Sequence, residues 1–125
     1  MSDRPPSPQP PELKTMRFEA RGPVGTLTLA RPDAMNAMSP ELIAELALIA
    51  PWLADRAPIR ALIVTGEGRA FSAGGDINWF QRGAEDPGGD LVQDVRRGAD
   101  VLHQAIVDLK RIPYPVIAAI NGPAA

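Results

Sequence analysis

A chain of 125 residues, of which 45% are hydrophobic, has the size of one small domain and enough apolar side chains for a core. Its net charge of −2 and lack of a basic cluster argue against a nucleic-acid-binding surface. The absence of cysteine excludes a disulfide framework and a cysteine nucleophile, and no apolar run is long enough for a signal peptide or membrane helix. We therefore expect a soluble cytoplasmic protein with no membrane partner.

Residues 1–12 are rich in proline and polar side chains, which predicts a disordered leader. Alternating apolar and polar residues then predict a strand over 13–20. A glycine–proline turn at 21–23 and a second alternating stretch over 24–29 predict an antiparallel hairpin.

A helix is predicted to begin at Ser39-Pro40-Glu41. Ser39 can accept a hydrogen bond from a first-turn amide, and Pro40 lacks the amide that would otherwise have no partner. The helix carries an apolar stripe of Leu42, Ile43, Leu46, Ile49 and Leu53. Pro51 is expected to kink or end it.

Two apolar runs, 61–65 and 116–120, predict strands that are buried on both faces, the first of them central. Between them we expect a short helix over 77–81, a mobile surface loop over 82–89 that could act as a lid, and a long helix over 90–112. The apolar face of the long helix would consist of Leu91, Val95, Ala99, Leu102, Ile106 and Leu109. A turn follows at 121–123. This order of elements predicts an α/β layered fold.

The segment 70–77 combines a tight turn with a helix start. Gly74 and Gly75 permit dihedral angles that a side chain would forbid, and Asp76 can cap a helix that begins near Ile77. The amide of Gly75 would then point outward beside a helix N-terminus, where it is a good donor to an anion or oxyanion.

Three segments together resemble the enoyl-CoA hydratase/isomerase (crotonase) family. They are Arg-Pro-Asp-Ala-Met-Asn-Ala-Met (31–38), Ala-Phe-Ser-Ala-Gly-Gly-Asp-Ile (70–77) and Pro-Val-Ile-Ala-Ala-Ile-Asn-Gly (115–122). The resemblance covers 16–125 and implies a crotonase-like fold of repeated β-β-α units. It also implies that 13–125 are the N-terminal part of such a domain, truncated in the second oxyanion-hole motif. By the same resemblance, the full-length protein would be a homotrimer or a dimer of trimers.

The resemblance also implies a chemistry. Two backbone amides would bind the thioester oxygen of an acyl-CoA substrate and stabilise an enolate, and Gly75 would carry the first amide. Ala73, Asp76, Ile77 and Arg31 would join Gly75 in binding coenzyme A, which is part of the substrate, so no separate cofactor or metal is expected. Hydration of a 2-enoyl-CoA is the default reaction. Isomerisation is the alternative, since the amino-acid sequences of the motifs are similar to those of the phenylacetate-pathway ring-epoxide isomerase branch.

The chain departs from the family pattern at two positions. Asp33 and Asn78 stand where the family often has cations that meet coenzyme phosphates, and Arg31, Arg69 and Arg82 could compensate. Trp79 and His103 are candidates for the acyl pocket. His103, the only histidine, suits acid/base work and is similar in placement to a working histidine of aroyl-CoA dehalogenases, or it is a passive rim residue.

Other functions stay open at this point. Segment 70–74 looks like a degenerate nucleophile elbow around Ser72, which would make the protein an α/β-hydrolase. Phe71 occupies the position of the third glycine of a dinucleotide-binding loop, and no P-loop motif is present. Two further alternatives remain. The chain could be a non-catalytic acyl-CoA-binding fragment, or a complete small protein that closes its core in another way.

Overall fold

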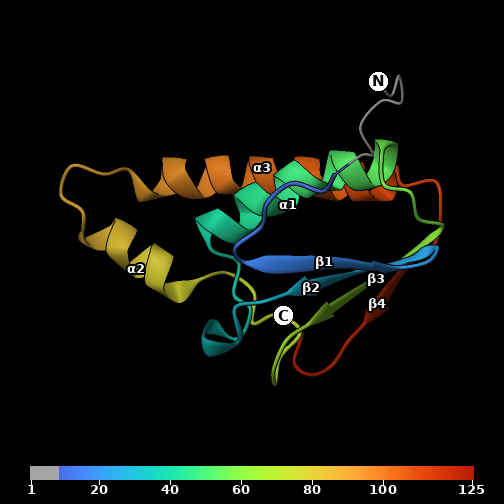
Figure 1. Cartoon of the computed structure of the whole chain (residues 1–125). Helices are drawn as coiled ribbons and strands as arrows, with labels where there is room; N and C mark the ends of the chain where they lie inside the picture. The colour runs from blue at the N-terminus through green and yellow to red at the C-terminus, as the bar shows by residue number, and fades with distance from the viewer. Residues whose placement is uncertain (1–8) are drawn as a thin grey trace, which may run out of the picture.

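A computed structural model describes residues 9–125 and arranges them as a four-stranded sheet with helices on one face (Figure 1). The elements are β1 (Met16–Arg21), β2 (Val24–Leu29), a short 3₁₀ helix (Pro32–Ala34), α1 (Pro40–Asp55), β3 (Ala61–Gly66), α2 (Ile77–Glu85), α3 (Leu91–Lys110) and β4 (Val116–Ala119). Most of the predicted leader, 1–8, lies outside the described residues, and 9–12 carry no helix or strand.

The strands lie in the order β1-β2-β3-β4, so β3 is an interior strand as predicted. Strands β1 and β2 form an antiparallel hairpin, which confirms the hairpin predicted from the sequence. The pairs β2–β3 and β3–β4 are parallel, because α1 crosses from β2 to β3 and α2 with α3 crosses from β3 to β4. The order of elements matches the α/β expectation, with β1, β2 and α1 as the first β-β-α unit.

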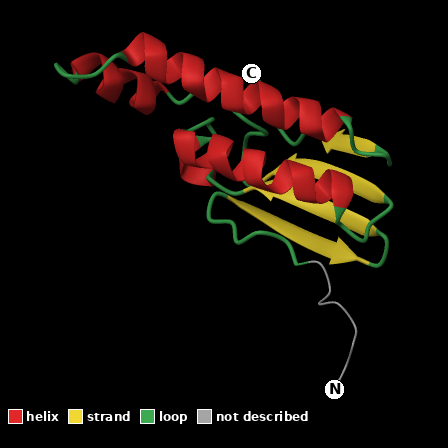
Figure 2. Ribbon diagram, turned by 90° about the horizontal axis from the view of Figure 1, so that it is seen from above, coloured by secondary structure: helices red, strands yellow, loops and turns green. Residues whose placement is uncertain are grey.

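The core lies between the sheet and the paired helices α1 and α3, which run side by side in both views (Figures 1 and 2). Leu27, Leu42, Ile49, Leu53 and Leu62 are almost completely buried there. Burial of each such side chain contributes about 1.5–3 kcal/mol relative to its exposure.

The start of α1 is as predicted, since Ser39 Oγ accepts from the Leu42 amide at 3.2 Å and the whole predicted stripe is buried. We expected Pro51 either to kink or to end the helix. It does not end the helix, because α1 continues to Asp55. An interior proline costs a helix about 3 kcal/mol. Trp52 and Leu53, which follow it, are buried at 8% and 0% exposure, and their packing offsets that cost.

The predicted loop over 82–89 is partly wrong, because α2 extends through Glu85 instead of ending at 81. Gly83 is tolerated inside the helix because Leu91 packs against it. A Cβ at this position would lie 2.6 Å from Leu91 Cδ1. The connection between α2 and α3 is therefore only 86–90, and Asp90 caps α3 by accepting from the Gln93 amide at 3.1 Å.

Burial of the last two predicted strands is lower than expected. Leu62 of β3 is fully buried, but the rest of β3 is only half-buried, and Val116 and Ile117 of β4 are 42% and 53% exposed. The physical reason is that the helices cover one sheet face only and β4 is an edge strand of the sheet in the described residues. Within residues 9–125, no helix is both long and apolar enough to cross a membrane.

The long helix also differs from its predicted apolar face. Ala105 of α3 and Ile112, which follows the end of the helix at Lys110, are buried although neither belongs to the predicted stripe, whereas Ile106 is 42% exposed. The side that packs on α1 is thus rotated relative to the prediction, which leaves part of the predicted stripe free to line a cavity.

Strand β1 starts three residues later than predicted because a carboxylate of α1 binds the preceding backbone. Glu45 Oε2 accepts from the Lys14 amide at 2.8 Å, and Glu45 Oε1 accepts from the Thr15 amide at 2.8 Å and the Thr15 hydroxyl at 2.7 Å. Burial alone raises the pKa of the Glu45 carboxyl. The hydrogen bonds from Thr15 and Lys14 and the charge of Lys14 outweigh burial, so the pKa lies below its ordinary 4.5.

We expect Glu45→Gln to destabilise the chain by about 1 kcal/mol at neutral pH, a value that allows for solvent screening. Because the folded-state pKa is depressed, the stabilisation is complete above the unfolded-state pKa and is lost as pH falls through the folded-state value. Urea unfolding at pH about 6 and about 3 should therefore show a smaller difference from the unsubstituted chain at the lower pH. Glu85→Gln, at an exposed carboxylate, is the control, and a difference that does not change with pH would contradict this role of Glu45.

Candidate active site

Three loops meet at one edge of the sheet, because each follows the carboxyl end of a parallel strand. The first, 30–39, follows β2; the second, 67–76, follows β3; and 120–125 follow β4. In Figure 1 the C-terminus lies among the other two loops. Ligand sites of sheets with parallel strands lie at this edge. The three sequence segments singled out above are thereby brought together.

Asn36 ties the first loop to the second. Its side chain is completely buried; Oδ1 accepts from the Arg31 amide at 2.8 Å, and Nδ2 donates to the carbonyls of Glu67 and Ala70 at 3.0 and 2.9 Å. The hydroxyl of Ser72 donates back to the Asn36 carbonyl at 2.9 Å. Asn36 also has a φ of 55°, a left-handed conformation that asparagine tolerates better than most residues. Asn36 therefore has a structural role: it joins the two loops.

Asn121 holds the third loop against the other side of the same turn. Its Oδ1 accepts from the Gly66 amide at 3.1 Å, and its Nδ2 donates to the Gly68 and Ala70 carbonyls at 3.0 and 3.2 Å. Gly122 is required next to it, because a Cβ there would clash with the carbonyl of Arg69. The Ala70 carbonyl is therefore bound by one asparagine from each neighbouring loop.

Asp76 is the N-cap of α2, as predicted. Its Oδ1 accepts from the amides of Asn78 and Trp79 at 2.9 and 3.3 Å, and its Oδ2 lies 3.5 Å from the guanidinium of Arg31. The residue is only 5% exposed. Both carboxylate oxygens are engaged, so Asp76 fixes the start of α2.

The amide of Gly75 stands out among its neighbours. The Gly74 amide donates to Ser72 Oγ at 3.1 Å, and the Asp76 amide donates to the Met38 carbonyl at 3.3 Å. Gly74 has a φ of 92°, which only glycine adopts at low cost and which turns the chain between these two bonds. Within residues 9–125 the Gly75 amide donates to no protein acceptor, and it lies beside the positive end of α2.

Two cavities meet at Gly75. One, of about 280 Å³, is lined by Ala73, Gly75, Asp76 and Ile77 and is called the turn cavity here. The other, of about 540 Å³, is called the apolar cavity. Its walls include Gly75, Met38, Leu46, Trp79, Phe80, Leu102 and Ile106. A ligand that spans both cavities would pass the free amide of Gly75.

The predicted site residues separate into three groups. Ala73, Gly75, Asp76 and Ile77 line one cavity together, and Trp79 lines the apolar cavity. Arg31 lines neither of these cavities. It lines a separate polar cavity of about 500 Å³, and its guanidinium donates to the Ala37 carbonyl at 2.7 Å. His103 lies on the exposed side of α3 and is absent from the apolar cavity wall.

A family model described as enoyl-CoA hydratase/isomerase matches residues 19–125. The chain belongs to the enoyl-CoA hydratase/isomerase family. Its similarity to a solved structure, that of a putative enoyl-CoA hydratase from Streptomyces coelicolor, has a TM-score of 0.75 at 34% identity, over 96% of this chain and 43% of that one. The chain therefore has the crotonase-type α/β fold of this family.

Two curated relatives show how much of the family's length is present. The chain is 37% identical to a probable enoyl-CoA hydratase of Mycobacterium leprae, with 83% of this chain and 35% of the relative covered. It is 39% identical to the 1,2-epoxyphenylacetyl-CoA isomerase of Escherichia coli, with 82% and 38% covered. The chain thus spans less than two fifths of the length of either relative.

The sequence analysis placed Asn121 in a turn and missed its hydrogen bonds to the second loop. It also placed Val95, Ala99, Leu102 and Ile106 in a packing stripe and missed that they line the apolar cavity. The predicted stripe of the long helix is no wider than contact with one neighbouring helix requires, so its pattern carried no signal of a second surface.

The hydrogen bonds of Asn36 predict a large loss of stability on truncation. Asn36→Ala should cost about 3 kcal/mol in urea unfolding, because the Arg31 amide and the Glu67 carbonyl lose a part-buried hydrogen bond and the Ala70 carbonyl loses one of its two asparagine donors. Asn36→Gly separates the causes: it accepts the left-handed φ but supplies no side chain, so it should lose nearly as much.

Asn78→Ala, at an exposed asparagine that lines the turn cavity, is the control and should change stability by no more than about 0.5 kcal/mol. If Asn36→Gly were as stable as the unsubstituted chain, the hydrogen bonds of Asn36 would not be what holds the two loops together.

Proposed function

We propose that the protein binds an acyl-CoA thioester and that the Gly75 amide donates a hydrogen bond to the thioester oxygen, stabilising the enolate formed in hydration of a 2-enoyl-CoA. The supporting observation is the position of this amide: it has no acceptor in the described chain, lies at the start of α2, and belongs to a residue that lines both the turn cavity and the apolar cavity. Membership of the enoyl-CoA hydratase/isomerase family supports the substrate class.

The two cavities suit the two ends of such a substrate. The turn cavity, with Ala73, Asp76 and Ile77, would receive the coenzyme A end, and Ile77 offers it a side chain that is 75% exposed. The apolar cavity would receive the acyl group, since its walls are hydrocarbon, aromatic and glycine residues. An amide at the junction is then placed at the carbonyl that links the two ends.

Coenzyme phosphates need cations, and the chain offers two arginines in one place. Arg31 and Arg82 both line the polar cavity, which shares Asp76 and Asn78 with the turn cavity. Because Arg31 is already bound to the Ala37 carbonyl and to Asp76, we assign the phosphate contact to Arg82.

Acid and base groups for the reaction are not part of the apolar cavity wall, since the residues lining it carry no titratable side chain. Asp76 is occupied as a cap and ion-pair partner. The proton transfers are therefore assigned to parts of the family's length that this chain does not match. Isomerisation is the second candidate reaction, favoured by the 39% identity to a 1,2-epoxyphenylacetyl-CoA isomerase.

Gly75→Pro tests the central assignment, because proline has no amide hydrogen. In a protein that turns over 2-enoyl-CoA, the substitution should lower kcat by about 10²- to 10³-fold, the usual effect of losing one oxyanion donor, while coenzyme A still binds. Gly75→Ala keeps the amide and serves as the matched control; it adds only a Cβ, about 2.8 Å from Phe80 Cζ before that ring adjusts. Near-normal turnover by Gly75→Pro would contradict the assignment.

Product mass distinguishes the candidate functions. A protein that contains this chain and turns over 2-enoyl-CoA should yield a product heavier by one water if it is a hydratase. A product of unchanged mass and altered structure would replace hydration by isomerisation. The chain alone should bind the acyl-CoA saturably without forming product, because the proton transfers are assigned outside it, and product formation by the chain alone would contradict that assignment.

A further inference from the structure

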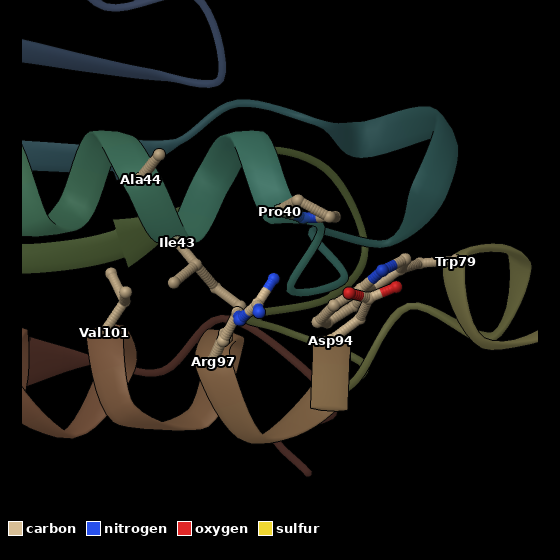
Figure 3. A pocket seen from close by; sticks show the side chains of 8 residues that line it. Pro40, Ile43, Ala44, Trp79, Asp94, Arg97 and Val101 are labelled. Atoms are coloured by element: carbon tan, nitrogen blue, oxygen red, sulfur yellow. The ribbon is translucent and has the colours of Figure 1, made fainter. Parts of the chain in front are cut away.

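Trp79 stands between two cavities. It lines the apolar cavity beside Gly75, and it also lines a cavity of about 330 Å³ between α1 and α3, called the interhelical cavity here. Figure 3 shows Trp79 reaching from α2 toward the space between Pro40 and Ile43 of α1 and Val101 of α3. Gly98 is the other residue that lines both cavities. The partition between them therefore consists of one indole ring and one glycine.

Gly98 makes room for the indole. A Cβ at Gly98 would lie 2.6 Å from Trp79 Cη2, closer than real contacts allow, so the ring packs directly against the backbone of α3. Any other residue at position 98 would force the indole to move. A glycine in the interior of a helix destabilises the helix relative to alanine, and here it provides space for the ring.

The backbone of Trp79 is fixed by the same turn that presents Gly75. Its amide donates to the Asp76 carboxylate at 3.3 Å, and its ring lies 5.3 Å from that of Phe80, measured between centroids. Phe80 in turn packs against Gly75, since a Cβ there would lie 2.8 Å from Phe80 Cζ. The partition is thus held at a fixed place relative to the Gly75 amide.

We propose that Trp79, seated on Gly98, sets the upper length of the acyl chain that the protein accepts. This inference rests on the proposed function, because it takes the apolar cavity as the acyl site. A straight acyl chain that enters past Gly75 would fill this cavity and stop at the indole. Behind the indole, Ile43, Ala44 and Val101 offer further apolar surface, and Asp94 and Arg97 lie on the same cavity wall.

Removal of the indole should join the two cavities. Each methylene that a ligand buries is worth about 4-fold in affinity. The affinity of the unsubstituted protein should rise with acyl length and then stop rising. Trp79→Ala should continue the rise, so that a chain two methylenes beyond the original optimum binds about 15-fold tighter to the variant than to the unsubstituted protein.

The experiment is calorimetric titration of the protein with free coenzyme A and with saturated straight-chain acyl-CoAs of increasing length, each below its micelle concentration. Trp79→Ala is compared with Val92→Ala, an exposed residue of α3 that lines neither cavity. Trp79→Phe is included because its smaller ring keeps most of the packing; it should shift the optimum in the same direction by less. Circular dichroism checks that each variant is folded.

A longer optimum in Trp79→Ala, with Val92→Ala unchanged, supports the inference. The same optimum in all folded Trp79 variants, with short acyl-CoAs still bound more tightly than coenzyme A, would overturn the inference and leave the proposed function intact. If no acyl-CoA bound more tightly than free coenzyme A to the unsubstituted protein, the proposed function would fail, and the inference with it.

Discussion

The carbonyl oxygen of Ala70 accepts hydrogen bonds from the side-chain amides of two asparagines, one in each neighbouring loop. The geometry of the site depends on this arrangement. Asn36 reaches it from the loop after β2 and Asn121 from the loop after β4, at 2.9 and 3.2 Å. Each of these two hydrogen bonds contributes about 0.5–1.5 kcal/mol, so both neighbouring loops hold the second loop in place. The glycine turn that follows Ala70 is consequently fixed in place before any ligand binds.

A fixed turn explains why one amide is left free. Ser72 and Met38 accept from the amides on either side of Gly75, and Asp76 binds the first amides of α2 and the guanidinium of Arg31. The left-handed φ of Gly74 directs the chain between these bonds. The Gly75 amide is therefore preorganised beside a helix N-terminus, and a donor that needs no rearrangement is the most effective kind for stabilising developing negative charge.

Much of this arrangement could be predicted from sequence, because it depends on local signals. The capping side chains of Ser39 and Asp76, the hairpin turn and the apolar stripe of α1 are patterns within a few residues, and each is confirmed. The start of β1 and the extent of α2 could not be predicted, because they depend on contacts with the neighbouring helices, through Glu45 of α1 and Leu91 of α3. The apolar cavity was not predicted because it depends on a contact between two helices: no pattern within α3 predicts that Trp79 of α2 packs on Gly98.

The most direct test of this account is the amide NMR signal of Gly75 in protein labelled at glycine. Titration with butyryl-CoA should move the Gly75 amide proton strongly downfield, as a new hydrogen bond to the thioester oxygen requires, whereas free coenzyme A should leave it nearly unchanged. The signal can be assigned by its loss in Gly75→Ala. If butyryl-CoA bound and shifted other glycines of the site while the Gly75 amide proton stayed where it was, the central claim would be wrong.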